Sequence, residues 1–213
     1  MEQPRHLYVM LSRTGTGMGK VIRLFTRSEY NHVSLTLDGS LGSFVSFARY
    51  VEDVALAGGF VKESAERFLS GGQPVPVRIF QVDISPARYE QLNTIFSLAG
   101  KQEAGLIYNS LGALLSTWHL RFHIPGSYTC LEFASAILQQ SFRSLQELEH
   151  HLKSYEIYHG DLWDMVTDSG DRSDPYFTHR GFFRGAADTA VHFIRLAGKL
   201  LRICRCNDPI KML

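Results

Sequence analysis

Residues 30–49 read YNHVSLTLDGSLGSFVSFAR, and this stretch decides the fold. In NHVSLTLD (residues 31–38) apolar and polar side chains alternate, which predicts a half-buried strand with His32 on its polar face. Asp38 is followed by Gly39, which is a turn signal. The apolar segment SFVSFA (residues 43–48) then predicts a returning strand, so the stretch predicts an antiparallel hairpin.

Two further strands and several helices are predicted around this hairpin. Strands are expected at residues 6–12 and 75–83, the second of them starting at a sheet edge because of Pro76. Helices are expected at residues 19–27, 65–69 (a short helix in the loop 50–74), 85–101, 108–118, 129–140 and 144–152, with one more turn at 161–166. Strands come early and helices late, without strict alternation. This order predicts an α+β fold with an antiparallel sheet packed against helices.

Length and composition favour one large domain with an appendage. The chain has 213 residues, and we predict a domain over residues 1–167 followed by a linker and a basic amphipathic helix over 168–213. With 22 basic and 21 acidic residues, the net charge of +1 gives no reason to expect a nucleic-acid partner.

The cysteines and the apolar runs bear on location. Three cysteines do not form a disulfide framework, and no run is long enough for a secretory signal or a membrane span. We therefore expect a cytoplasmic protein.

A glycine-rich loop and the histidines are the candidates for a cofactor site and a metal site, and neither has the required residue spacing. The loop GTGMGK (residues 15–20) lacks the spacing of a phosphate-binding loop, so it predicts an ordinary turn. The nine histidines have no partner residues at ligand spacing. The sequence therefore predicts neither a cofactor nor a metal site.

Cys130 is the candidate nucleophile. It lies at the predicted N-terminus of the helix TCLEFASAIL, where the helix dipole favours a thiolate and backbone N–H groups face an oxyanion. His32 lies on the polar face of a strand and is a candidate partner, because a Cys at a helix start against a His on a strand is typical of thiol hydrolases. The alternative is that Cys130 is a small core residue. Glu132, in the same turn, is expected to position the helix.

The segments YNHVSLTLD, SFVSFAR, GGFVKE, YNSLG and YTCLEFASAIL, read in this order, resemble the circularly permuted papain-like cysteine hydrolases. These form the YiiX/YaeF-type branch of the NlpC superfamily, a group related to lecithin retinol acyltransferase. The resemblance covers residues 6–140 and implies a papain-like fold, a catalytic pair of Cys130 and His32, and no cofactor.

The resemblance also implies a third residue that orients the histidine, on the strand after the His strand. That strand offers Ser43 and Ser46, and alternation favours Ser46, with an ordinary outward strand residue as the alternative. Tyr128, Asn31 and Ser12 are candidates for the oxyanion site or the cleft wall, and a core position is the alternative for Tyr128.

The expected activity is thiol hydrolysis or acyl transfer through a Cys130 thioester. The substrate would be an amide or ester of a small molecule, a peptide or a lipid-like acyl group. The alternative is a ligand- or lipid-binding module without turnover, which a serine as third residue favours because a hydroxyl orients a histidine weakly. For the basic helix at residues 186–205 two interpretations stay open, contact with a membrane surface or packing on the domain.

Overall fold

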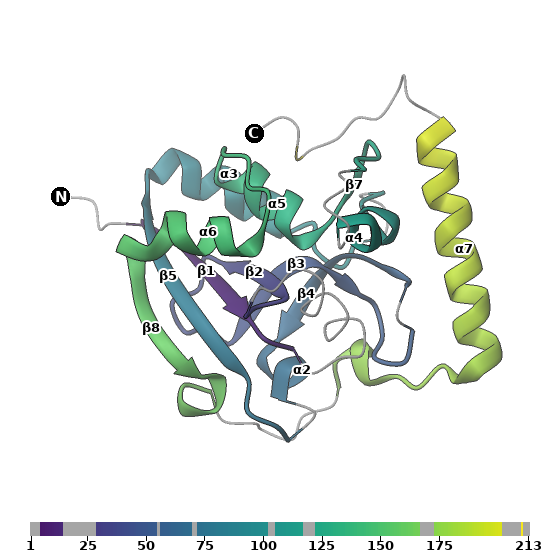
Figure 1. Cartoon of the computed structure of the whole chain (residues 1–213), viewed down its shortest axis with the longest axis horizontal. Coiled ribbons are helices and arrows are strands. Elements are labelled where there is room, and N and C mark those ends of the chain that lie inside the picture. Colours follow the sequence, from purple (N-terminus) through teal and green to yellow (C-terminus); the bar gives the residue numbers. More distant parts are fainter. Residues whose placement is uncertain are drawn as a thin grey trace.

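An eight-stranded sheet organises the chain in its computed structural model (Figure 1). The structure describes residues 5–14, 29–54, 56–69, 72–101, 105–116, 122–166, 173–201 and 210. The strands are β1 (Arg5–Ser12), β2 (His32–Thr36), β3 (Ser43–Arg49), β4 (Gly58–Ser64), β5 (Pro76–Ile84), β6 (Ile107–Tyr108), β7 (Ser127–Tyr128) and β8 (Glu156–Asp161). Their order in the sheet is β7-β6-β4-β3-β2-β1-β5-β8. All neighbours pair antiparallel except β6 and β7.

Helices cover both faces of this sheet. The α-helices are α2 (Ala65–Leu69), α3 (Pro86–Phe96), α4 (Ser110–Ser116), α5 (Cys130–Ile137), α6 (Leu145–Leu152) and α7 (Gly181–Leu201). The short 3-10 turns are η2 (Lys153–Tyr155), η3 (Leu162–Asp164) and η4 (Pro175–Phe177). Figure 1 shows α3, α5 and α6 together on one side of the sheet, with α7 standing at its far end. The chain is therefore an α+β protein, as its sequence predicts.

Strand alternation divides the core into two layers. In β1, Leu7, Val9 and Leu11 face the layer shared with α3, α5 and α6, whereas Met10 faces the layer that includes Leu69 of α2. Because both faces of the central strands are covered, they are buried almost throughout. The sheet therefore holds the ends of β2 and β4 in fixed positions.

The predicted hairpin is confirmed as β2 and β3, which pair antiparallel with Leu35 opposite Val45. The helix start at Ser85-Pro86 is also confirmed, since the Ser85 side chain accepts the N–H of Arg88. The edge position expected for the strand at residues 75–83 is wrong. β8 pairs with β5 along its outer side, and Pro76 is its first residue, where no ladder hydrogen bond has to be donated.

The interpretation of residues 50–74 as loop around a short helix missed β4. The reason is Gly58-Gly59, which as a sequence signal indicates a turn. In the structure these glycines allow close packing instead, because a Cβ at Gly58 would lie 2.3 Å from the carbonyl oxygen of Ala48. A Cβ at Gly59 would lie 2.2 Å from the Tyr50 hydroxyl.

Several predictions fall outside the described residues. They are the helix at 19–27, the glycine loop at 15–20, the start of the linker at 168 and the C-terminal part of the basic helix. Among the described helices, α7 is the longest, and none has the length and hydropathy needed to cross a membrane.

Candidate functional site

Cys130 is the first residue of α5, and a capping box holds this end of the helix. The Thr129 side chain accepts the N–H of Glu132 at 3.1 Å, and the Glu132 carboxylate accepts the N–H of Thr129 at 2.7 Å. Glu132 therefore positions the helix, as expected, and it also contacts His123 at 3.2 Å. Since the first N–H groups of a helix lack intrahelical acceptors, the N–H of Cys130 remains a donor for a bound group.

His32, the first residue of β2, lies beside Cys130. A side-chain hydrogen bond with Cys130 is among the interactions that raise the pKa of the His32 imidazole. The imidazole ring also lies against the ring of Phe68, with 6.2 Å between the centroids. The structure thus brings together the two residues that the sequence singled out, from elements far apart in the chain.

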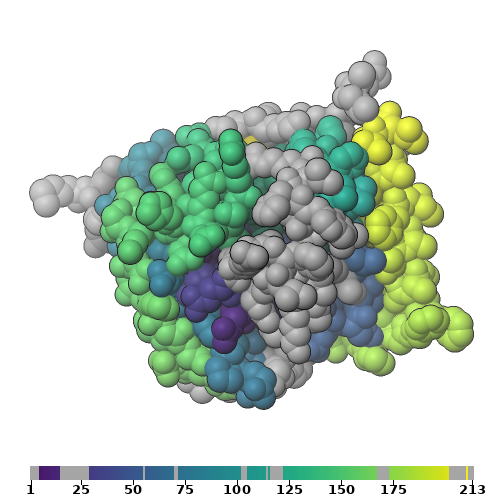
Figure 2. Space-filling view, in the orientation of Figure 1, coloured from purple at the N-terminus to yellow at the C-terminus, as the bar shows by residue number. Residues whose placement is uncertain are grey.

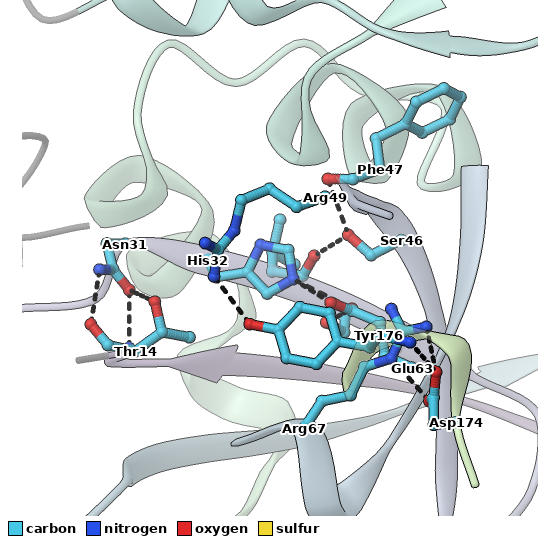
Figure 3. A network of polar contacts seen from close by, with 12 residues as sticks. Thr14, Asn31, His32, Ser46, Phe47, Arg49, Glu63, Arg67, Asp174 and Tyr176 are labelled. Atoms are coloured by element: carbon cyan, nitrogen blue, oxygen red, sulfur yellow. Dashed lines mark hydrogen bonds and ion pairs between the residues drawn. The ribbon is translucent and has the colours of Figure 1, made fainter. Parts of the chain in front are cut away.

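Glu63 of β4 holds the imidazole at Nε2. The Nε2 atom of His32 lies 3.1 Å and 3.0 Å from the two carboxylate oxygens of Glu63, as Figure 3 shows. Ser34 lies two residues after His32, on the same face of β2. Its hydroxyl donates a hydrogen bond of 2.7 Å to the same carboxylate. Cys130, His32 and Glu63 thus form a line of neighbouring side chains. This is the arrangement of a nucleophile, a base and an orienting acid.

The pKa values of His32 and Glu63 follow from this buried contact. Burial alone would lower the pKa of His32, but the charge of Glu63 and the hydrogen bonds with Cys130 and Glu63 raise it to about 10. Burial would raise the pKa of Glu63, but the charge and hydrogen bond of His32, the hydroxyl of Ser34 and the charge of Arg67 lower it. The imidazole is therefore protonated and the carboxylate ionised at neutral pH.

Arg67 and Asp174 surround the Glu63 end of the line. Arg67 donates two hydrogen bonds of 2.7 Å to the Asp174 carboxylate, which ties the segment around η4 to α2 (Figure 3). Tyr176 is buried beside them, with the Arg67 guanidinium 4.9 Å from its ring centroid and an Arg49 hydrogen bond of 2.7 Å on its hydroxyl. The C-terminal segment thus contributes to the surroundings of Glu63.

Ser46 does not orient His32, and this corrects the prediction from sequence. Its hydroxyl donates to the carbonyl oxygens of Val33 at 2.9 Å and of Phe47 at 3.4 Å. A serine side chain is short, so it bonds to the nearest backbone acceptor of the neighbouring strand. Glu63, on the next strand, has the reach that Ser46 lacks. The segment FVKES places two apolar residues before three polar ones, so it carries no alternating strand signal that points to Glu63.

The other candidates divide between the site and the core. Ser12 is fully buried directly opposite His32 in the β1–β2 register, and its hydroxyl has no hydrogen-bond partner in the described part of the chain. Asn31 accepts the N–H of Thr14 at 2.8 Å and donates to its carbonyl oxygen at 3.0 Å, so it fastens the chain after β1. The Tyr128 ring packs in the core against Phe47, in line with its alternative interpretation.

Tyr108 was not among the candidates and lies close to Cys130. Burial and the charge of Cys130 both raise the pKa of Tyr108, so its phenol stays protonated and able to donate a hydrogen bond. It belongs to β6, although the sequence predicts the start of a helix at this position. The parallel pairing of Tyr108 with Tyr128 brings β6 to the strand that leads into α5.

A cavity of about 730 Å³ lies between α7 and strands β3, β4 and β6. Its lining includes the apolar side chains of Val54, Val61 and Val191, with Lys62 and Arg195 among the charged ones. Neither Cys130 nor His32 lines it. Arg67 and Asp174 do line it, so the cavity adjoins the Glu63 end of the site.

Replacing Ser46 with Ala is expected to lower stability without changing the geometry of His32. Loss of its buried hydrogen bond to Val33 costs about 0.5–1.5 kcal/mol in the free energy of unfolding. Urea denaturation of Ser46→Ala measures this cost. The His32 ring resonances in NMR should titrate as in the unchanged chain. A shift of that titration toward the ordinary histidine range would restore Ser46 as the orienting residue.

The contact between His32 and Glu63 also predicts how stability depends on pH. The raised pKa of His32 stabilises the fold fully below 6.5, and this contribution is lost as the pH rises through about 10. The lowered pKa of Glu63 stabilises the fold above 4.5, and this contribution is lost as the pH falls through the folded value. The difference in free energy of unfolding between the unchanged chain and His32→Gln should therefore be largest between 4.5 and 6.5. A difference that grows toward pH 10 would contradict the assignment.

No family model, no curated protein and no solved structure matches the chain.

Proposed function

We propose that the chain is a thiol hydrolase or acyltransferase with a papain-like arrangement, in which Cys130, His32 and Glu63 act as nucleophile, base and orienting acid. One observation carries the proposal. The imidazole of His32 is held by a buried carboxylate and lies within electrostatic reach of a cysteine at a helix N-terminus. Structural cysteines have no need of such a partner, whereas nucleophilic ones do.

The proposed reaction begins with an ion pair. A protonated imidazole beside a thiol stabilises the thiolate, as does the N-terminal end of a helix. The Cys130 sulfur attacks the carbonyl carbon of an amide or ester, and the carbonyl electrons move to the oxygen. The N–H of Cys130 is placed to donate to that oxyanion.

Collapse of this intermediate breaks the bond to the leaving amine or alcohol, which takes a proton from His32. The acyl group remains on Cys130 as a thioester. Water or another acceptor then attacks the thioester carbonyl and gives its proton to His32, which releases the acid or the transferred product. Glu63 keeps the imidazole in position and stabilises its charged form throughout. No cofactor enters these steps.

Tyr108 is the candidate for the second oxyanion donor. Its phenol stays protonated close to Cys130, and a neutral phenol donates without competing as an anion. Tyr128 is the weaker candidate, because its ring is packed among core side chains.

The alternative of a binding module without turnover has lost its main support. That support was a serine as third residue, and the contact on His32 comes from a carboxylate. The substrate class remains an amide or ester of a small molecule, a peptide or a lipid-like acyl group.

Pre-steady-state kinetics with activated esters and anilides of increasing acyl length test the proposal. A thioester intermediate predicts a burst of released alcohol that approaches one equivalent of protein, followed by slower turnover. Added amines or alcohols that raise the turnover rate would indicate acyl transfer. If neither burst nor turnover occurs with the whole panel, the chain is a binding module.

A further inference from the structure

α7 exposes large apolar side chains along its whole length. The exposed fractions are 84% for Phe182, 86% for Phe183, 71% for Ile194 and 84% for Leu201. Phe193 and Leu200 are each exposed by 38%, and Val191, exposed by 47%, lies at the margin of this face where it also lines the cavity. A soluble surface seldom gathers so many large apolar side chains on one element.

The opposite side of α7 fixes the helix on the domain. His192 and Leu196 are its buried residues. The Nε2 atom of His192 lies 3.1 Å from the Ser110 hydroxyl, and Leu196 packs with Ile107 and Ile124. Because this side is anchored, the apolar side faces away from the sheet. Figure 2 shows the helix as a flank of the molecule, at the right in yellow.

The apolar face is broad and unbroken. At 100° per residue, the exposed apolar side chains and the alanines between them cover an arc of about 180°. Within that arc α7 carries only Phe, Leu, Ile, Val, Ala and Gly. The surface of a helix with such an arc is convex, so it has no groove for a partner side chain. It can, however, lie along an extended and flat apolar surface.

Basic residues border this arc. Arg184, Arg195 and Lys199 fall within about 60° of one another around the helix axis. Between Arg180 and Arg205 the sequence has six basic residues and one acidic residue, Asp188, whereas the whole chain has a net charge of only +1. Asp188 falls in the same sector and lies 3.7 Å from Arg180, so the three basic residues leave this sector with a net positive charge. The border of the apolar face is thus complementary to an anionic surface.

We propose that α7 docks the protein onto an anionic lipid bilayer and lies in the plane of its interface. Phe182, Phe183, Ile194 and Leu201 would insert among the headgroups and upper acyl chains, while the basic border contacts lipid phosphates. The helix stays attached to the domain through His192 and Leu196, so docking requires no unfolding. This surface is separate from Cys130, and its test does not depend on catalysis.

Flotation of the full chain with vesicles tests the proposal. Vesicles of phosphatidylcholine with phosphatidylglycerol should carry the protein upward, and pure phosphatidylcholine should carry clearly less. Added salt should weaken the binding. Phe182→Ser with Phe183→Ser should lower the partition coefficient about tenfold or more. Both side chains are almost fully exposed, so this variant should keep its thermal midpoint.

A matched control removes exposed apolar side chains from another place. Tyr155→Ser with Ile157→Ser changes residues exposed by 45% and 51% near β8. This variant should float like the unchanged chain. The pair Arg184→Glu and Lys199→Glu should lose binding to the anionic vesicles.

Three results would overturn the proposal. One is failure of the unchanged chain to float with anionic vesicles. Another is equal loss of flotation in the control and in the phenylalanine variant. The third is a dimer in solution that dissociates on the phenylalanine changes, because the apolar face would then be an interface between two copies of the chain.

Discussion

Replacing Cys130 with Ala is expected to abolish turnover of every amide or ester substrate, with a loss of at least about 10³-fold in kcat. The change removes the atom that forms the thioester, so no other residue of the line can compensate for it. Steady-state hydrolysis with the best ester of the panel measures the loss.

Cys204→Ala is the matched control, because it removes a thiol that the proposed reaction does not use. Its kcat should stay unchanged. The thermal midpoint of Cys130→Ala should stay close to that of the unchanged chain, since Cys130 is only partly buried. Turnover that survives in Cys130→Ala would place the activity elsewhere on the chain.

Replacing Glu63 with Gln is expected to lower kcat by about 10²- to 10⁴-fold while KM changes little. A neutral amide of the same shape cannot stabilise the protonated imidazole. The pKa of His32, about 10 beside the Glu63 carboxylate, should therefore fall toward its ordinary value of 6.5. The pH profile of kcat should shift in the same direction. NMR titration of the His32 ring reports the pKa independently of turnover.

Glu132→Gln is the control for Glu63→Gln. Glutamine still fits a capping box, so the N-terminus of α5 should keep its position and kcat should stay within about threefold. If Glu63→Gln leaves both kcat and the His32 titration unchanged, Glu63 is a buried structural acid and another group orients the histidine.

The sequence predicted the parts of the fold that local patterns determine. The hairpin of β2 and β3 followed from alternation and a turn signal, and the helix that carries Cys130 from the segment TCLEFASAIL. These segments carry Cys130 and His32, so the central pair of the site could be predicted. Their contact required the fold, because β2 and α5 are far apart in sequence.

The third residue could not be found in the same way. Glu63 lies on β4, whose two glycines indicate a turn unless the close approach of Ala48 and Tyr50 is known. β8 was missed because only pairing with β5 distinguishes it from a loop. Both errors concern strands whose stability comes from tertiary contacts rather than from local preference.

Covalent labelling of Cys130 directly tests whether Cys130 and His32 act as a reactive pair. An activated ester is mixed with the unchanged chain, with His32→Ala and with the urea-unfolded chain, and the acylated peptide is identified by mass spectrometry. One acyl group is expected on Cys130 of the folded chain, with labelling at least about tenfold slower in His32→Ala and in the unfolded chain. Equal labelling of Cys130 in all three samples, or acylation of the folded chain at other residues only, would contradict this expectation.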